Sequence, residues 1–376
     1  MTSVRTVLIV GGGTAGCALA ALLGRAGVSV EIVERLPGFT TYGSGITLMG
    51  AALRVLRDIG VWDELSQHGY AFDSVGIRSA SGRLLAELPD TRTGGPDLPS
   101  TLGAYRPKLA EVLANAAVGA GAKVRLGTTV TAIVEAEDEV EVTFSDGDTG
   151  HYDLLVAADG IRSATRAQLG IDASPEPAGM GIWRVHARRR PAEVQRTELV
   201  YDGPCYIAGF CPTGEDTLYA YLVEDSRATA PEGPAERLAA MRALAEAYHG
   251  PWDEIREDMT DGDLINYTWF ESLLLEGPWN RGRGVVIGDA AHACPPTMAL
   301  GAAMALEDAA VLAELLLSRD QVDQDLFDTF VARRRPRVRA VVESSMQLVR
   351  WQLAHDRSAD VPGLMHTLNT MISEAA

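Results

Sequence analysis

The sequence predicts an α/β fold with an α+β insertion: a mostly parallel sheet, an inserted antiparallel sheet and C-terminal helices. Three observations support this prediction. Short, continuous apolar runs at Val7–Val10, Leu154–Ala157 and Gly284–Ile287 are each followed by a glycine-containing turn, which is typical of parallel strands buried on both faces. Short alternating segments fill much of the region from 176 to 275. After residue 326 the pattern is mainly helical.

The first strand leads into a strand–turn–helix–strand pattern, "RTVLIVGGGTAGCALAALLGRAGVSVEIVER". Gly11, Gly13 and Gly16 form GxGxxG, in which the glycines allow a tight turn, close approach of a pyrophosphate and close packing of the helix. Glu34 ends the second strand, where a carboxylate can accept hydrogen bonds from ribose hydroxyls. A glycine triplet alone can be an ordinary turn, but this context predicts a Rossmann-type dinucleotide site. NAD and FAD share the half that such a unit holds, so the motif leaves the choice open.

Two further strand ends carry an acidic residue beside a glycine. Asp159-Gly160 follows the strand Leu154–Ala157, and Gly288-Asp289 follows the strand Gly284–Ile287. An Asp-Gly pair can be a simple turn. Ligands in open α/β sheets, however, bind outside the carboxyl ends of parallel strands. We therefore expect the three glycine-bearing turns to meet at one crevice.

Together the three motifs resemble those of the FAD-dependent aromatic hydroxylases, single-component flavoprotein monooxygenases that include 4-hydroxybenzoate and salicylate hydroxylases. The matching patterns are GxGxxG with "ER" (Glu34, Arg35), "DGxxSxxR" (Asp159, Gly160, Ser163, Arg166) and "GDAAH…P…G…EDA" (Gly288, Asp289, His292, Pro296, Gly301, Glu307, Asp308). The similarity extends from residue 5 to about residue 340.

The resemblance implies that the chain binds FAD. Glu34 would hold the adenosine ribose, Arg106 would lie beside the ribityl–phosphate chain, and the backbone of Val130 would meet the adenine. Asp289 would bind the ribityl or pyrophosphate part, and Asp159 lies where the family links flavin binding to nicotinamide use. The full set of expected FAD contacts is Gly11, Gly13, Thr14, Ala15, Gly16, Glu34, Arg35, Gly45, Arg106, Val130, Asp159, Gly160, Gly288, Asp289, Pro296, Gly301, Ala302 and Ala303.

The helix beginning near Gly301 would direct its free N–H groups at N1 and the C2 carbonyl of the flavin, which become negative on reduction. A plain core helix would fit its apolar sequence equally well. Related sequences usually read "AQGAAMA" where this chain reads "ALGAAMA", so Leu300 replaces a glutamine and removes a side-chain amide expected near the flavin. His292 is expected to have a structural role rather than a catalytic one. No catalytic acid or base is assigned.

The alternating segments "MGIWRVHARR", "RTELVYDG", "CYIAGFCP" and "TLYAYLVED" predict an antiparallel sheet that covers the flavin and shapes a substrate cavity. The expected cavity-lining residues are Arg184, Tyr206, Phe210, Tyr219, Tyr221 and Pro296. Tyr219 and Tyr221 should share one face of a strand. The alternatives are packing for the aromatic residues and a solvated side chain for Arg184.

Composition limits the possible partners. A formal net charge of −18 argues against nucleic acid or an anionic membrane surface as a partner. The longest apolar stretch is interrupted by Glu307 and Asp308, so no membrane span is predicted. Four cysteines without metal-binding spacing are expected to be reduced thiols, and we expect no metal site. We also expect a cytoplasmic location, because no targeting segment is visible, and a monomer or homodimer.

These observations predict a discontinuous FAD-binding domain (residues 1–70, 102–175 and 276–325), a substrate-binding sheet domain (71–101 and 176–275) and a C-terminal helical segment (326–376). The predicted activity is a monooxygenase reaction. NAD(P)H would act as transient electron donor and O2 as co-substrate, and a flavin C4a-hydroperoxide would insert one oxygen atom into an aromatic or heteroaromatic small molecule.

Three alternatives remain open at this stage. A flavin-dependent reductase or a Baeyer–Villiger or epoxidising enzyme could use the same fold, and so could a non-catalytic nucleotide-binding protein. No second GxGxxG is present, which favours brief visits by NAD(P)H without a Rossmann unit of its own. The identity of the substrate and the preference between NADH and NADPH are not determined by the sequence.

Overall fold

The first of two large β-sheets has six strands. The computed structural model describes residues 3–39, 43–136 and 138–376. The strand order is β18 (Asn280–Arg281), β19 (Gly284–Val286), β12 (Leu154–Ala157), β1 (Thr6–Val10), β2 (Ser29–Glu34) and β8 (Lys123–Leu126). All neighbouring pairs are parallel except β18–β19. The α/β fold and the three apolar strands are therefore as predicted.

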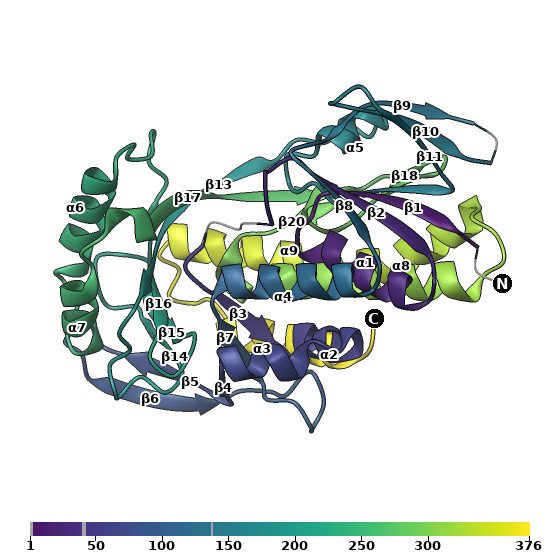
Figure 1. Cartoon of the computed structure of the whole chain (residues 1–376). Coiled ribbons are helices and arrows are strands. Elements are labelled where there is room, and N and C mark those ends of the chain that lie inside the picture. Colours follow the sequence, from purple (N-terminus) through teal and green to yellow (C-terminus); the bar gives the residue numbers. More distant parts are fainter. Residues whose placement is uncertain (1–2, 40–42, 137) are drawn as a thin grey trace.

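Helices cover this sheet on one side. α1 (Thr14–Arg25), α4 (Arg106–Gly119) and α8 (Gly301–Ser318) lie below it in the view of Figure 1, and α1 packs against both of the others. A three-stranded antiparallel sheet lies above it: β9 (Val130–Glu135), β10 (Val140–Phe144) and β11 (Thr149–Tyr152). The short helix α5 (Ala164–Gln168) contacts β9. Residues Val7 to Val10 are almost fully buried, which explains their continuous apolar sequence.

The second large sheet has eight strands. Its order is β20 (His292–Ala293), β17 (Ile265–Leu274), β13 (Glu176–Ala187), β16 (Leu218–Asp225), β15 (Ile207–Pro212), β14 (Thr197–Val200), β5 (Ser74–Arg78) and β6 (Leu84–Pro89). The parallel pair β14–β5 joins the two segments predicted to form the inserted sheet, and the remaining pairs are antiparallel. The domain boundaries themselves stay a prediction.

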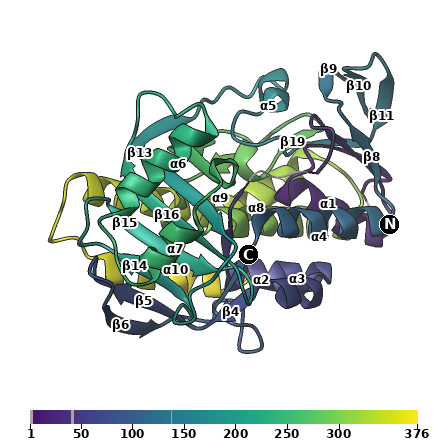
Figure 2. The ribbon, with the colours of Figure 1, turned by 60° about the vertical axis from the view of Figure 1, so that its left-hand side comes forward.

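α6 (Pro234–Ala245) and α7 (Pro251–Asp258) cover the outer face of this sheet (Figure 2). The long strands β13 and β17 extend from that end of the molecule toward the six-stranded sheet (Figure 1). α9 (Gln324–Leu353) and α10 (Val361–Ser373) follow α8, so the C-terminal segment forms two helices. A small sheet of β3 (Ile46–Met49), β7 (Thr101–Ala104) and β4 (Tyr70–Phe72) lies beside α2 (Gly50–Ile59) and α3 (Trp62–His68).

Two turn glycines are required by the backbone. Gly11 has φ +108°, and a Cβ there would lie 2.4 Å from the carbonyl oxygen of Ala158. Gly288 has φ +60° at the end of the strand β19, in the left-handed region that side-chain-bearing residues seldom adopt. A bulkier residue at either position would displace a strand end of the parallel sheet.

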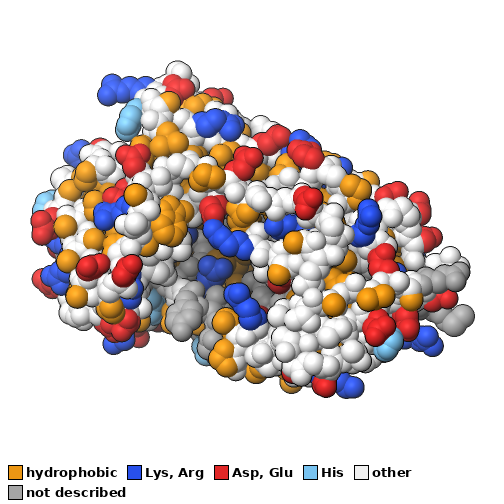
Figure 3. Space-filling view, turned by 90° about the horizontal axis from the view of Figure 1, so that it is seen from above, with side chains coloured by type: hydrophobic (Ala, Val, Ile, Leu, Met, Phe, Trp, Pro, Cys, Tyr) orange, Lys and Arg blue, Asp and Glu red, His pale blue; other side chains and the backbone are white. Residues whose placement is uncertain are grey.

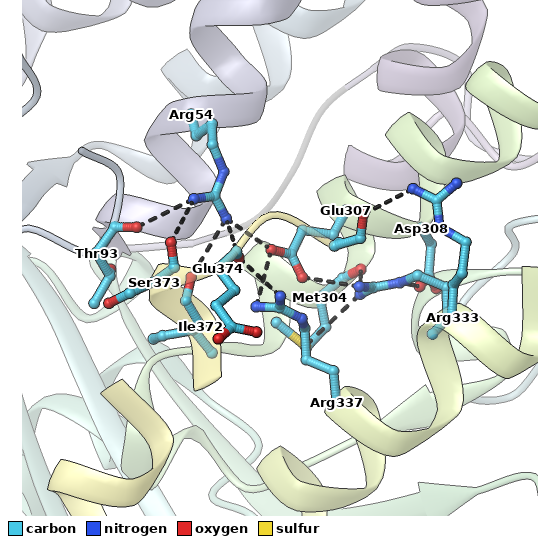
Figure 4. Close-up of polar contacts among 12 residues, drawn as sticks. Arg54, Thr93, Met304, Glu307, Asp308, Arg333, Arg337, Ile372, Ser373 and Glu374 are labelled. Carbon is cyan, nitrogen blue, oxygen red and sulfur yellow. Dashed lines mark hydrogen bonds and ion pairs between the residues drawn. The ribbon is translucent and has the colours of Figure 1, made fainter. Parts of the chain in front are cut away.

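Buried charges connect α8 to its neighbours. Arg334 of α9, which is fully buried, donates from Nε to Asp308 Oδ1 at 2.7 Å and from Nη1 to Glu307 Oε2 at 2.9 Å. Glu307 also pairs with Arg54 of α2 and Arg337 of α9. Arg54 in turn donates to the carbonyl groups of Ile372 and Glu374 at the C-terminus (Figure 4). The network therefore ties α2, α8, α9 and the C-terminal residues together.

We predict that Arg334→Ala lowers the free energy of unfolding by about 3 kcal/mol, because it removes the fully buried cation that bonds to both Glu307 and Asp308. The neighbouring Arg333→Ala is the matched control. Arg333 pairs with the largely exposed Glu314, and the loss of such a pair costs about 1 kcal/mol or less. Urea unfolding followed by circular dichroism measures both values, and equal losses would contradict the assigned role of the buried network.

The network also predicts that the free energy of unfolding depends on pH. Burial alone would raise the pKa of Asp308, but His292 and Arg334 lower it from 3.8 to about 2. The unfolded chain therefore binds a proton before the folded protein does, and Asp308 contributes roughly 2 kcal/mol above about pH 4 that is lost as the pH falls toward 2. The stability difference between the native protein and Asp308→Asn should accordingly shrink when unfolding is measured at about pH 3 instead of about pH 6. A constant difference would show that this carboxyl does not titrate as described.

Candidate active site

A cavity of about 330 Å3 lies where β1, β12 and β19 end. It is lined by Gly13 after β1, Gly160 after β12 and Asp289 after β19, and by Gly301 at the start of α8. The predicted convergence of the three glycine-bearing turns on one crevice is thus confirmed.

The expected FAD contacts form two groups, according to whether or not they line this cavity. Those that line it are Gly13, Thr14, Ala15, Gly45, Arg106, Gly160, Asp289, Pro296, Gly301 and Ala302. Those that do not line it are Gly11, Gly16, Glu34, Arg35, Val130, Asp159, Gly288 and Ala303. In the second group, Gly11 and Gly288 shape the turns on which lining residues depend.

Three helices begin at this cavity. α1 starts after Gly13, α4 starts at Arg106, and α8 starts at Gly301. Among the described residues, no side chain caps the first N–H groups of these three helices. Apart from the chain neighbours of Gly13 and the backbone of its own helix, no described atom lies within 4 Å of where a Cβ of Gly13 would be. Free N–H groups and helix dipoles therefore make this a favourable place for negative charge.

Glu34 lies at the end of β2, next to the first glycine turn. Its carboxylate accepts hydrogen bonds from the N–H groups of Gly12 at 2.9 Å and Leu36 at 2.8 Å. These bonds hold the side chain beside the turn, with acceptor capacity left for ribose hydroxyls. Val130 begins β9 and is buried, and its carbonyl oxygen accepts a bond from Gln168. Contacts of either residue with adenosine stay a prediction.

The turn that carries Asp289 is fixed from two sides. Asp308 accepts hydrogen bonds from the Gly288 N–H at 2.9 Å and from His292 Nε2 at 2.6 Å. Arg166 donates to the carbonyl of Ala290 at 2.7 Å. Asp289 itself is turned toward the cavity, where the surrounding protein desolvates it and raises its pKa, while nearby His292 and Arg106 act in the opposite direction.

Two motif residues serve local structure. Asp159 accepts hydrogen bonds from Ser163 and from the N–H and hydroxyl of Thr165, so it ties down the start of α5. His292 is buried and hydrogen-bonded to Asp308, and the centroid of its ring lies 5.5 Å from that of the Trp279 ring. A structural role for His292 agrees with the expectation from the sequence.

Leu300, where the resemblance implies a glutamine, is part of the core. Its side chain is 2% exposed, belongs to the main core and does not line the cavity. Its side chain therefore contributes to core packing at the start of α8. Ala299, directly before it, has φ +53°, a left-handed conformation that turns the chain into the helix.

A second cavity, of about 210 Å3, adjoins the first along the inner face of the eight-stranded sheet. Five residues line both cavities: Thr47, Arg184, Tyr219, Pro296 and Ala299. Tyr219 and Tyr221 share one strand face as predicted, with ring centroids 5.4 Å apart, and the Tyr219 hydroxyl lies 2.9 Å from that of Thr47. Arg184, Tyr219, Tyr221 and Pro296 are thus in the expected place.

The expectation was wrong for Phe210 and Tyr206. Phe210 is fully buried on the opposite face of the sheet, where its ring lies 6.2 Å from that of Trp252 of α7. Strand alternation explains this, because Ile207 of the same strand faces the cavity and Phe210 is an odd number of residues away. Tyr206 does not line the cavity and instead bonds to Asp225 at 2.7 Å and stacks on His355.

Several cavity residues were missed from the sequence. Ile182 lies two residues from Arg184, and Val223 lies two residues from Tyr221. Each therefore shares a strand face with a predicted residue, so strand alternation could have found both. Met365 belongs to α10, and Phe72 and Asp90 come from the segment between residues 70 and 90. Nothing local in the sequence marks these three, because only the tertiary fold brings them to the cavity.

Arg184 carries positive charge into the junction of the two cavities. Burial lowers its pKa to about 10, and the like charge of Arg106 acts in the same direction. It therefore remains a cation near neutral pH. Figure 3 shows a hollow on one face of the molecule with basic side chains in and around it, although the net charge of the chain is −18.

All four cysteines are free thiols, as expected. Within the described ranges, no helix has the length and apolar character needed to cross a membrane, and no cluster of three or more His, Cys, Asp or Glu could hold a metal ion.

Comparison with known proteins adds to this geometry. Residues 5–345 match the family model described as FAD binding domain. The aurachin C monooxygenase/isomerase of Stigmatella aurantiaca is 33% identical, with 83% of this chain and 80% of that protein covered. The 2-heptyl-3-hydroxy-4(1H)-quinolone synthase of Pseudomonas aeruginosa is 32% identical, with coverage of 82% and 80%.

A solved structure, HpxO of Klebsiella pneumoniae complexed with FAD and uric acid, has the same fold. Its TM-score is 0.81 at 20% sequence identity, with 98% of this chain and 92% of that chain covered. The sequence motifs, the convergent strand ends and the family match agree with one another. The chain therefore belongs to the FAD-binding, aromatic-hydroxylase-like family of flavoprotein monooxygenases and has FAD as its cofactor.

Proposed function

We propose that this enzyme uses NAD(P)H and O2 to insert one oxygen atom into an aromatic or conjugated heterocyclic small molecule. The observation that carries the proposal is the shared wall of the two cavities, formed by Thr47, Arg184, Tyr219, Pro296 and Ala299. A cofactor in the first cavity and a substrate in the second would meet across this wall. The names of the two relatives, which refer to aurachin C and a heptylquinolone, support a heteroaromatic substrate.

The residues of the first cavity, together with Glu34, Arg35 and Val130 outside its lining, suit FAD. The start of α1 would hold the pyrophosphate, Glu34 and Arg35 the adenosine part, and Val130 the adenine through its backbone. Arg106 and Asp289 would hold the chain between pyrophosphate and ring, and the start of α8 would stabilise negative charge on the ring. When bound, FAD supplies the redox chemistry: it accepts electrons from NAD(P)H and activates O2 for transfer of one oxygen atom.

The protein's own contribution is binding, orientation and exclusion of water. Apolar side chains surround most of the second cavity, so a bound substrate would displace water from the reaction site. Arg184 and the Tyr219 hydroxyl are polar groups at the junction and would orient the substrate. This chemistry needs no protein nucleophile, and the proposal assigns none.

We predict that NAD(P)H oxidation by the holoenzyme is stimulated by an aromatic substrate and that one atom of ¹⁸O from ¹⁸O2 appears in the product. Mass spectrometry of the products, with NADH and NADPH tested separately, measures both outcomes. NAD(P)H-dependent turnover without ¹⁸O incorporation would instead identify a reductase. Ring expansion or an epoxide carrying ¹⁸O would identify Baeyer–Villiger or epoxidation chemistry.

We also predict that Asp289→Ala weakens FAD retention about tenfold or more, because the variant loses a carboxylate acceptor in the cofactor cavity. The FAD-to-protein ratio after purification and titration of the apoprotein with FAD measure the effect.

The matched control is Asp148→Ala, which removes an exposed carboxylate from the segment between β10 and β11, away from the cavity. It should retain FAD like the native protein. An Asp289→Ala protein that purified fully yellow with unchanged FAD affinity would refute the assignment of this residue.

A further inference from the structure

The two ends of the second cavity differ in polarity. Where it adjoins the cofactor cavity it contains Arg184, Tyr219 and Thr47. Away from that junction it is lined mainly by apolar side chains, among them Ile182, Val223, Phe270 and Met365. The two ends therefore suit different parts of one molecule.

At the junction end, Arg184 is a cation without a carboxylate partner among the described residues. It donates from Nη1 to the Thr268 hydroxyl at 2.7 Å, and it lies on the central strand β13, directly across from Tyr221 of β16. Arg184 is only partly exposed, and a partly desolvated cation in a cavity is stabilised by an opposite charge, because desolvation of an isolated ion is costly. An anionic group on the substrate would supply the missing counterion.

At the other end, the apolar wall is extensive. Ile182, Ile207, Val223 and Phe270 are nearly fully buried and form a separate small core with Met180 and Val349 of α9. Asp90 also borders this end, but it accepts hydrogen bonds from the Thr91 N–H at 2.8 Å and the Thr101 hydroxyl at 3.2 Å. Its negative charge would disfavour an anion there. A small, fully polar aromatic acid would leave most of the apolar wall without a partner.

We propose that the substrate is amphiphilic. An aromatic head carries an anionic oxygen group that pairs with Arg184 at the cofactor junction, and an apolar substituent, such as an alkyl chain, occupies the end formed by Ile182, Ile207, Val223, Phe270 and Met365. Arg184 is then a specificity-determining residue, and the apolar end sets the preferred length of the substituent. This inference rests on the proposed monooxygenase function and adds the class of substrate to it.

The probes are 4-alkyl-2-hydroxybenzoates with ethyl, butyl and hexyl chains, together with the matching carboxamides, which have nearly the same shape but no charge. Dissociation constants are measured from the change in flavin absorbance when the oxidised holoenzyme is titrated with each compound. This readout needs no turnover. Affinity should rise roughly tenfold for each two carbons added, the increment expected for burial of methylene groups, until the cavity is filled. The carboxamides should bind about tenfold or more weakly than the acids.

Variants at two positions separate the two ends of the cavity. Arg184→Met should abolish the preference for acid over carboxamide while the chain-length dependence remains, and Arg184→Lys should restore part of the preference. Met365→Trp narrows the apolar end from α10 and should weaken binding of the hexyl compound at least tenfold with little effect on the ethyl compound. Arg189→Met is the control, because Arg189 is 69% exposed and pairs with Glu254 outside the cavity. Arg189→Met should change neither the preference for acid over carboxamide nor the dependence of affinity on chain length.

A flat affinity along the alkyl series, or an equal loss for acid and carboxamide in Arg184→Met, would overturn the inference. Both results could occur in an enzyme that still incorporates ¹⁸O into some other aromatic compound, in which case the proposed function would stand. A holoenzyme that binds the series as expected but incorporates no oxygen into any compound would support the binding assignment and reject the monooxygenase reaction.

Discussion

The carboxylate of Asp308 holds together the part of the molecule on which the candidate site depends. It accepts hydrogen bonds from the Gly288 N–H, His292 and Arg334, which belong to a strand-end turn, the short strand β20 and the helix α9. Because Asp308 lies on α8, these bonds fix the turn bearing Asp289 relative to the helix whose N-terminus lines the same cavity. The motif residues Gly288, His292 and Asp308 are thus parts of one buried unit, and Asp289, next to Gly288, lines the cavity.

The electrostatic potential at the first cavity is set by the helices that begin there and not by the net charge of the chain. The chain as a whole is strongly acidic, but α1, α4 and α8 all begin at the first cavity without side-chain caps. Arg106 and Arg184 line the same cavity. Helix termini act over the length of about one turn, so they create a region favourable to anions inside a protein of negative net charge. A pyrophosphate and a reduced flavin are both anions that such a region would stabilise.

The strand β13 connects the cofactor and substrate ends of the molecule. It is the longest strand of the eight-stranded sheet and pairs on both sides, with β16 and with β17. Its even-numbered residues Ile182 and Arg184 face the second cavity, and Trp183 faces the core under α6 and α7. The backbone of a strand that is paired on both sides has little freedom to shift, so the positions from which Arg184 and Ile182 extend are held in a defined relation to the cofactor site.

The sequence by itself determined the parallel strands, the glycine turns and the helix after Gly301, because these depend on local patterns of apolar residues and on glycine conformations. It also determined that three strand ends meet, since carboxyl ends of neighbouring parallel strands share one edge of a sheet. Only the tertiary structure decided which side chains line the second cavity. Phe210 was predicted wrongly because alternation specifies two faces without saying which is inward. Met365 could not be predicted because α10 reaches the cavity through long-range packing. The burial of Leu300 at the start of α8 likewise depends on the tertiary structure.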